Sequence, residues 1–110
     1  MDKVQLVDVK EFKIKPKIAY DSMGRPTTNI LFEVKFYSYM EDPRTRKRTT
    51  YTTIRDFGTL DFQQLINLSN TIVDKDMKQL LKEFIQRVMN NNIKLTDVLN
   101  NGQTINLKHY

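Results

Sequence analysis

The chain has 110 residues, of which 39% are apolar and 28% are charged, and its formal net charge is +5. This length suits a single domain over residues 1–110, with one two-layered core but no large enclosed pocket as well. The absence of cysteine excludes disulfides, thiolate nucleophiles, Cys-based zinc sites and iron–sulfur clusters.

Neither a membrane span nor a signal peptide is indicated. No apolar run approaches the roughly 20 residues that a membrane span needs. The first ten residues contain Asp2 and Asp8 and lack the apolar segment of a signal peptide. We therefore expect a cytoplasmic protein without membrane contact. Its small size and its high content of Lys, Asn, Ile and Thr also fit an accessory protein of a bacterium, phage or mobile element.

Residues 1–58 are predicted to form mainly strands. Apolar and basic residues alternate from Phe12, with Phe12, Ile14, Ile18 and Tyr20 on one face and Lys13, Lys15 and Lys17 on the other. This period of two is typical of a half-buried strand. Pro16 cannot donate to a sheet ladder, which indicates an edge strand or a bulge there. The alternation of apolar residues also shifts by one position between Leu6 and Val7, which predicts a bulge or bend near Leu6–Lys10.

Two further strands are expected. Turn residues at 21–26 precede a second strand over about residues 28–40. One face of it would be core (Ile30, Phe32, Val34, Phe36, Met40), and the other is amphipathic and aromatic (Leu31, Glu33, Lys35, Tyr37, Tyr39). A loop over 41–47 leads to a β-branched, aromatic strand over 49–57. The three strands predict an antiparallel meander with a hairpin tip at Pro43–Lys47.

Residues 59–102 are predicted to be mainly helical. Asp61 followed by Gln64 indicates an N-cap with a capping box. The region 61–90 fits one helix or two, and we favour two, broken near Asp74, because Thr71–Val73 are poor helix formers. Thr96 to Gly102 is typical of a capped helical turn, and residues 103–110 would be a short closing strand or tail. The predicted class is α+β, a three-stranded antiparallel meander followed by two helices on one sheet face.

A basic cluster lies at the predicted hairpin tip, since Arg44, Arg46, Lys47 and Arg48 are cationic. Such an arm suits nucleic acid, because cations contact phosphates and a two-stranded ribbon enters a groove. Tyr37, Tyr39 and Tyr51 would lie near its base, where rings can stack on unpaired bases. The alternative is a solvated loop whose charges keep an exposed hairpin soluble.

A second basic feature is the polar face of the first strand. If that strand neighbours the second, Lys35 joins Lys13, Lys15 and Lys17 in a positively charged sheet surface. This surface would extend the phosphate contacts of the arm. Lysines on an edge strand also protect against aggregation, which is the alternative interpretation.

The chemistry-bearing residues do not indicate an enzyme. Asp61 is explained as a cap, and Asp74 and Asp76 by a helix dipole. His109, next to the C-terminus, is the only histidine, so no serine has a base partner. Three isolated glycines make no phosphate-binding loop. We expect no catalytic residue, no metal site and no cofactor.

The favoured hypothesis is a non-enzymatic nucleic-acid-binding module, for DNA or RNA. The alternative is a small protein of phage or mobile-element type that binds an acidic or nucleic-acid-binding host protein through the same residues. A third is a subunit of a larger assembly. Because a domain of this size buries its apolar surface marginally, a homodimer through a helix face also stays open.

Over residues 10–73 the predicted order of strands and helix is similar in topology to small DNA-binding domains that lay a three-stranded sheet in the major groove. The arm-binding domains of some phage-type integrases are of that kind. The similarity is one of topology, and no shared motif accompanies it.

Overall fold

Three long strands dominate the computed structural model, which describes residues 5–109. They are β1 (Val7–Tyr20), β2 (Pro26–Glu41) and β3 (Arg48–Leu60), followed by α1 (Phe62–Thr71), α2 (Lys75–Met89), α3 (Leu95–Asn101) and β4 (Ile105–His109). The sheet is antiparallel, in the order β3-β2-β1-β4. The predicted α+β class and meander are confirmed, and the C-terminal segment is a strand beside β1. Residues 1–4, the first part of the N-terminal segment that lacks a signal-peptide pattern, lie outside the described residues.

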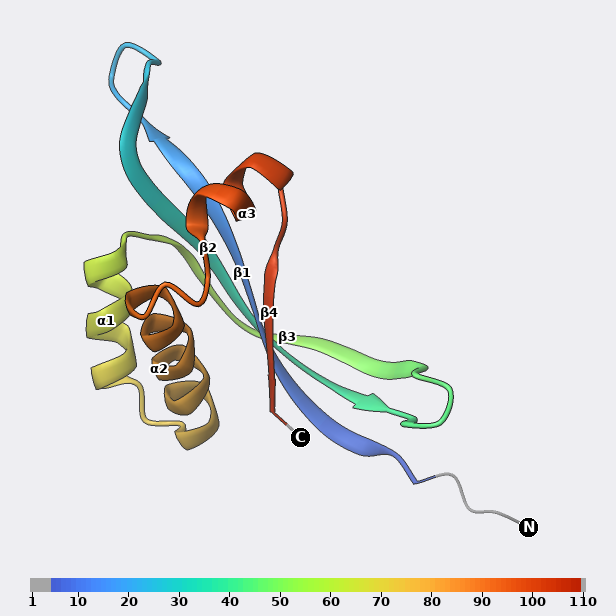
Figure 1. Ribbon diagram of the computed structural model, residues 1–110. Helices are drawn as coiled ribbons and strands as arrows, with labels where there is room; N and C mark the ends of the chain where they lie inside the picture. Colours follow the sequence, from blue (N-terminus) through green and yellow to red (C-terminus); the bar gives the residue numbers. More distant parts are fainter. Residues whose placement is uncertain (1–4, 110) are drawn as a thin grey trace.

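Two hairpin arms extend in opposite directions from the helix-covered part of the sheet (Figure 1). β4 pairs with Lys10–Ile14, and β3 pairs with β2 as far as Phe32, so the β1–β2 arm continues beyond both. Pro16 therefore lies where β1 has passed the end of β4. The predicted edge position of Pro16 is confirmed, because its missing N–H costs no ladder bond on an edge.

The core lies between the sheet and α1 and α2, which cover one face (Figure 1). Phe12 packs against Phe36 with ring centroids 4.8 Å apart, and Phe32 meets Phe84 edge-on at 5.7 Å. The helical region breaks into two, as expected. Asp61 forms the predicted capping box with Gln64, and the Asp74 carboxylate accepts the Met77 N–H at 3.0 Å.

Several local expectations were wrong. β1 pairs regularly from Val7 to Ile18, and its irregularity lies between Ile18 and Tyr20, not near Leu6–Lys10. Ile18 and Tyr20 are exposed rather than core, because the arm extends past the helices. The third helix starts at Leu95 after Lys94, so Thr96 is not its cap. Gly102 does end it in the left-handed conformation.

β3 carries three irregularities in its pairing with β2. The register shifts between Val34 and Lys35, between Phe36 and Tyr37, and between Ser38 and Met40. In each case β3 has one more residue than β2, which is the pattern of a β-bulge. Bulges increase the local twist and turn side chains to new directions. Gly58 at φ +71° and Thr50 at φ +51° supply left-handed backbone at two of these places.

The bulge at Gly58 gives a test of this backbone path. A Cβ at Gly58 would meet nothing within 4 Å, so a substitution there changes backbone strain alone. We expect Gly58→Ala to lower the free energy of unfolding by about 1–2 kcal/mol, because alanine is strained at positive φ. Gly58→Asn should cost clearly less, since asparagine tolerates this region. Urea unfolding of both variants measures the difference, and equal costs would contradict the assignment.

Candidate functional site

The face of the sheet that α1 and α2 do not cover, called the open face, carries charged and aromatic side chains. The Lys10 ammonium contacts Asp76 of α2 at 3.4 Å, so the even-numbered β1 positions around it face the helices. The alternate positions form the open face. They include Glu11, Lys13, Lys15 and Lys17 of β1, and Glu33, Lys35, Tyr37 and Tyr39 of β2.

A shallow hollow of about 150 Å³, the lysine hollow, lies in the middle of the open face. Its lining residues are Lys13, Lys15, Glu33, Lys35, Tyr37 and Thr104. Three of the four lysines expected on this face therefore come together, and they include the predicted partner from β2. The fourth, Lys17, is held by Glu33 at 2.9 Å, and its hydrogen bond lowers the pKa of Glu33 below the ordinary value.

Two of these lysines lie directly opposite each other. Lys13 of β1 pairs in register with Lys35 of β2, and both strands are interior at this point, since Lys13 also pairs with Asn106 of β4. Like charges directly across a ladder are unfavourable. Asp56 is the register partner of Lys35 on β3, and its carboxylate accepts the Gly58 N–H at 2.9 Å. The hollow therefore holds three lysines and one carboxylate, Glu33, which interacts with Lys35 and Lys15 as well as with Lys17, so the lysines outnumber the carboxylates there.

The three predicted tyrosines form a cluster beside the hollow. Tyr39 and Tyr51 are stacked, with centroids 5.2 Å apart and 13° between the ring planes, and Tyr37 meets Tyr51 at 5.0 Å. Tyr39 is buried, whereas Tyr51 is 43% exposed. Tyr51 is thus the most exposed member of the cluster.

Lys13 joins the hollow to the tyrosine cluster. Its ammonium lies 5.0 Å from the centroid of the Tyr37 ring and 5.3 Å from that of Tyr51, within cation–π range. A hydrogen bond with the Tyr51 hydroxyl raises the pKa of Lys13 above its ordinary value, against the effect of burial. Lys13 is therefore firmly cationic at neutral pH.

The basic hairpin tip divides into two parts. The segment 42–47, called the arm tip, is a tight turn in which the Asp42 carboxylate accepts the Arg44 N–H at 2.9 Å. That hydrogen bond lowers the pKa of Asp42. The Arg44 guanidinium lies 3.6 Å from the same carboxylate, and Arg46 and Lys47 are exposed.

Arg48 behaves differently from the other three cations of the predicted cluster. It is the first residue of β3, where it pairs in register with the buried Glu41. The Arg48 guanidinium is 3.9 Å from the Glu41 carboxylate and 4.8 Å from the centroid of the Tyr39 ring. These contacts hold Arg48 against the sheet rather than at the tip.

The sequence pattern gave no sign that one carboxylate of the open face, that of Glu11, is buried. Glu11 is fully buried on the open face, and the Lys108 ammonium of β4 lies 3.8 Å from it. Among the described residues, neither oxygen of Glu11 has a hydrogen-bond donor. The alternation from Phe12, extended back one residue, places Glu11 on this face. Nothing in the sequence brings Lys108 to it, because that contact depends on the pairing of β4 with β1.

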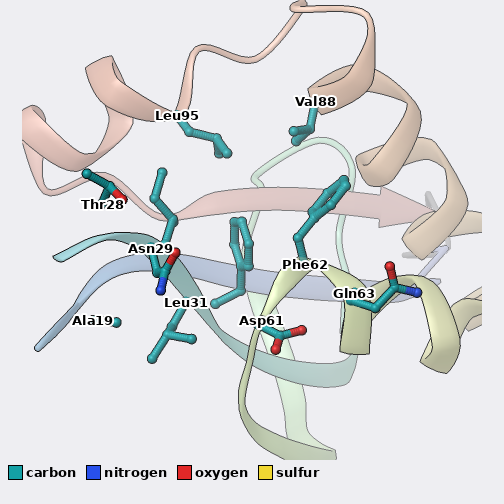
Figure 2. A pocket seen from close by; sticks show the side chains of 11 residues that line it. Ala19, Thr28, Asn29, Leu31, Asp61, Phe62, Gln63, Val88 and Leu95 are labelled. Atoms are coloured by element: carbon teal, nitrogen blue, oxygen red, sulfur yellow. The ribbon is translucent and has the colours of Figure 1, made fainter. Parts of the chain in front are cut away.

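A larger groove of about 590 Å³ lies elsewhere, between the base of the β1–β2 arm and the helices (Figure 2). Its lining is mainly apolar and includes Phe32, Phe62, Val88 and Leu95. Asp61 lies on its rim, but that carboxylate already accepts the Gln64 N–H at 2.7 Å as the cap of α1. Since no lysine or arginine lines it, this groove lacks the chemistry of a phosphate site.

Residues 5–109 contain no group of three or more His, Asp or Glu side chains placed to hold a metal ion. Within the same residues, no helix has both the length and the apolar character needed to cross a bilayer. His109 belongs to β4, where its backbone pairs with Lys10, and its side chain lies outside the described part.

Comparisons with protein-family models, with curated proteins and with solved structures gave no match to this chain. The topological similarity to arm-binding domains of integrases therefore carries no weight, and function rests on the geometry of the open face.

The pair of Glu11 and Lys108 can be tested by stability. We expect Lys108→Met to lower the free energy of unfolding by about 2–3 kcal/mol, because it leaves a buried carboxylate without its cation. The double variant Glu11→Leu with Lys108→Met should recover most of that loss, because no buried charge remains.

Urea unfolding of both single variants and the double variant completes the cycle. Strictly additive effects would show that the two side chains do not stabilise each other.

Proposed function

We propose that this protein is a nucleic-acid-binding module rather than an enzyme, and that the open face and the arm tip contact the sugar–phosphate backbone. The observation that carries the proposal is the Lys13–Lys35 pair. Lysines on an edge strand are explained by protection against aggregation. That explanation does not apply here, because both strands are interior where the pair lies. An anion bound in the hollow would offset the repulsion between them.

The remaining contacts continue along one path. Lys35, Tyr37, Tyr39 and Glu41 are alternate residues of β2, so the open face leads from the lysine hollow past the tyrosine cluster to the arm tip. Arg46 and Lys47 stand exposed at its end. A polyanion lying along β2 would meet cations at both ends and aromatic rings between them, which are the groups that bind nucleic acids most often.

Three of the basic residues expected to contact phosphate lie beside carboxylates of the protein: Arg48 beside Glu41, Lys17 beside Glu33 and Arg44 beside Asp42. Arg44 differs from the other two because it lies in the arm tip with 55% of its side chain exposed, whereas Arg48 and Lys17 lie within strands of the open face. We therefore assign the phosphate contacts to Lys13, Lys15 and Lys35 in the hollow and to Arg44, Arg46 and Lys47 at the arm tip. Arg48 and Lys17 serve mainly to hold the face in shape.

Salt-dependent binding tests this assignment. We expect the triple variant Lys13→Gln, Lys15→Gln, Lys35→Gln to bind labelled DNA or RNA more weakly, because fewer phosphates are neutralised. The slope of log affinity against log salt should decrease by roughly 0.7–0.9 for each phosphate that no longer meets a cation. Neutralising Arg44, Arg46 and Lys47 should decrease it further. Fluorescence anisotropy at several salt concentrations measures both.

The chain offers a matched control on the solvent side of α2. Changing Lys75, Lys78 and Lys82 to Gln removes the same charge from a different surface. This control should keep the wild-type slope. If both triple variants lose affinity equally, binding reflects net charge and not the open face. If the wild type fails to bind nucleic acid even at low salt, the proposal is wrong and the host-protein alternative takes its place.

A further inference from the structure

One tyrosine ring is presented to solvent in a fixed orientation on the open face. Tyr51 is 43% exposed, and one side of its ring is stacked on the buried Tyr39. Tyr37 supports it from a second direction, with its ring tilted by 40°. Because two neighbouring rings contact Tyr51, its orientation is largely set before a ligand binds, so little side-chain entropy is lost when a group stacks on its exposed part.

An irregularity in the backbone of β3 places this ring. The register shift between Ser38 and Met40 inserts one extra residue into β3, in the segment that contains Thr50 and Tyr51. Thr50 takes the left-handed conformation there, which is uncommon for a β-branched residue. Such irregularities turn a side chain away from its regular direction. In this case the result is the stack of Tyr51 on Tyr39.

The ring and the lysine hollow form one continuous site. The ammonium of Lys13 lines the hollow and also lies over the rings of Tyr37 and Tyr51. A group stacked on Tyr51 would thus have a cation beside it, and the next cations, Lys35 and Lys15, lie in the adjoining hollow. A flat group next to an anion, repeated along a chain, is the chemistry of a nucleotide strand.

We infer that the ligand of the open face is a single strand of nucleic acid, an inference that rests on the proposed function. One unpaired base would stack on Tyr51, and the lysine hollow would hold the neighbouring phosphates. In a duplex each base is covered above and below by its neighbours. A duplex would have to extrude a base to reach the ring, at a cost in unstacking and unpairing. Stacking of a base on Tyr51 therefore favours a single strand, because its bases need not be extruded from a duplex.

The experiment compares three probes of equal length, about twelve nucleotides each: an oligothymidylate, the same backbone with abasic sites, and a duplex. With the full wild-type chain, we expect the oligothymidylate to bind about 5- to 100-fold more tightly than the abasic strand, which is the effect expected of stacking one base. This comparison needs no variant, so it cannot fail through misfolding.

Variants then locate the effect. Tyr51→Ala should weaken oligothymidylate binding to the level of the abasic strand and leave abasic binding unchanged, while Tyr51→Phe should keep most of the affinity. Tyr20→Ala, which removes an exposed tyrosine from the other arm, should behave as wild type. Circular dichroism of each variant checks that the fold is intact.

The outcomes separate the inference from the proposal on which it rests. If the three probes bind alike in the wild type, or if the duplex binds best, the stacking inference is overturned, while weaker binding by the lysine-hollow variant would still support the proposed function. If none of the probes binds at low salt, both are overturned.

Discussion

The organisation of this protein depends on one constraint, which is that a single layer of helices covers one face of a sheet longer than the helices. Phe12 and Phe36 of the sheet share one buried core with Leu81 and Phe84 of α2, and this core fixes which side of β1 and β2 faces the helices. Because side chains alternate along β1 and β2, the same choice places their remaining residues on the opposite face. The open face therefore follows from the packing of the core, and its positive charge comes from the lysines that the sequence places at these alternate positions.

The open face is nevertheless not a plain solvated surface. Glu11 and Glu41 are buried on it, and each lies beside one cation, Lys108 and Arg48. These cations, together with Lys17, are committed to carboxylates of the protein. Under the proposed function, the cations that remain for a ligand are those of the lysine hollow and the arm tip, where Arg44 also lies beside Asp42. A modest net charge would then be sufficient, because these cations are gathered in two places.

Much of this arrangement was predictable from the sequence, because it depends on period and on local caps. The alternation from Phe12 and along β2 indicated the two faces, and Asp61 and Asp74 marked the helix starts. The grouping of Lys13, Lys15 and Lys35 required the added assumption that the first two strands pair. That assumption followed from the short turn between them, and the register confirms it.

Other features depend on contacts that no local pattern encodes. The bulges of β3 arise from its pairing with a shorter stretch of β2, and they decide where Tyr51 points. Arg48 belongs to a run of cations in the sequence, yet its register opposite Glu41 gives it a different role from Arg46. The exposure of Ile18 and Tyr20 reflects the length of the helices relative to the strands, which alternation alone does not reveal.

The most direct test of the central claim, that the open face is the binding surface, is an amide NMR titration of the full ¹⁵N-labelled chain with an oligothymidylate. We predict that the shift changes concentrate around Lys13, Lys35 and Tyr51 and continue to the arm tip, while α2 stays unperturbed. Changes centred on α1 and α2, or on the apolar groove of Figure 2, would contradict it.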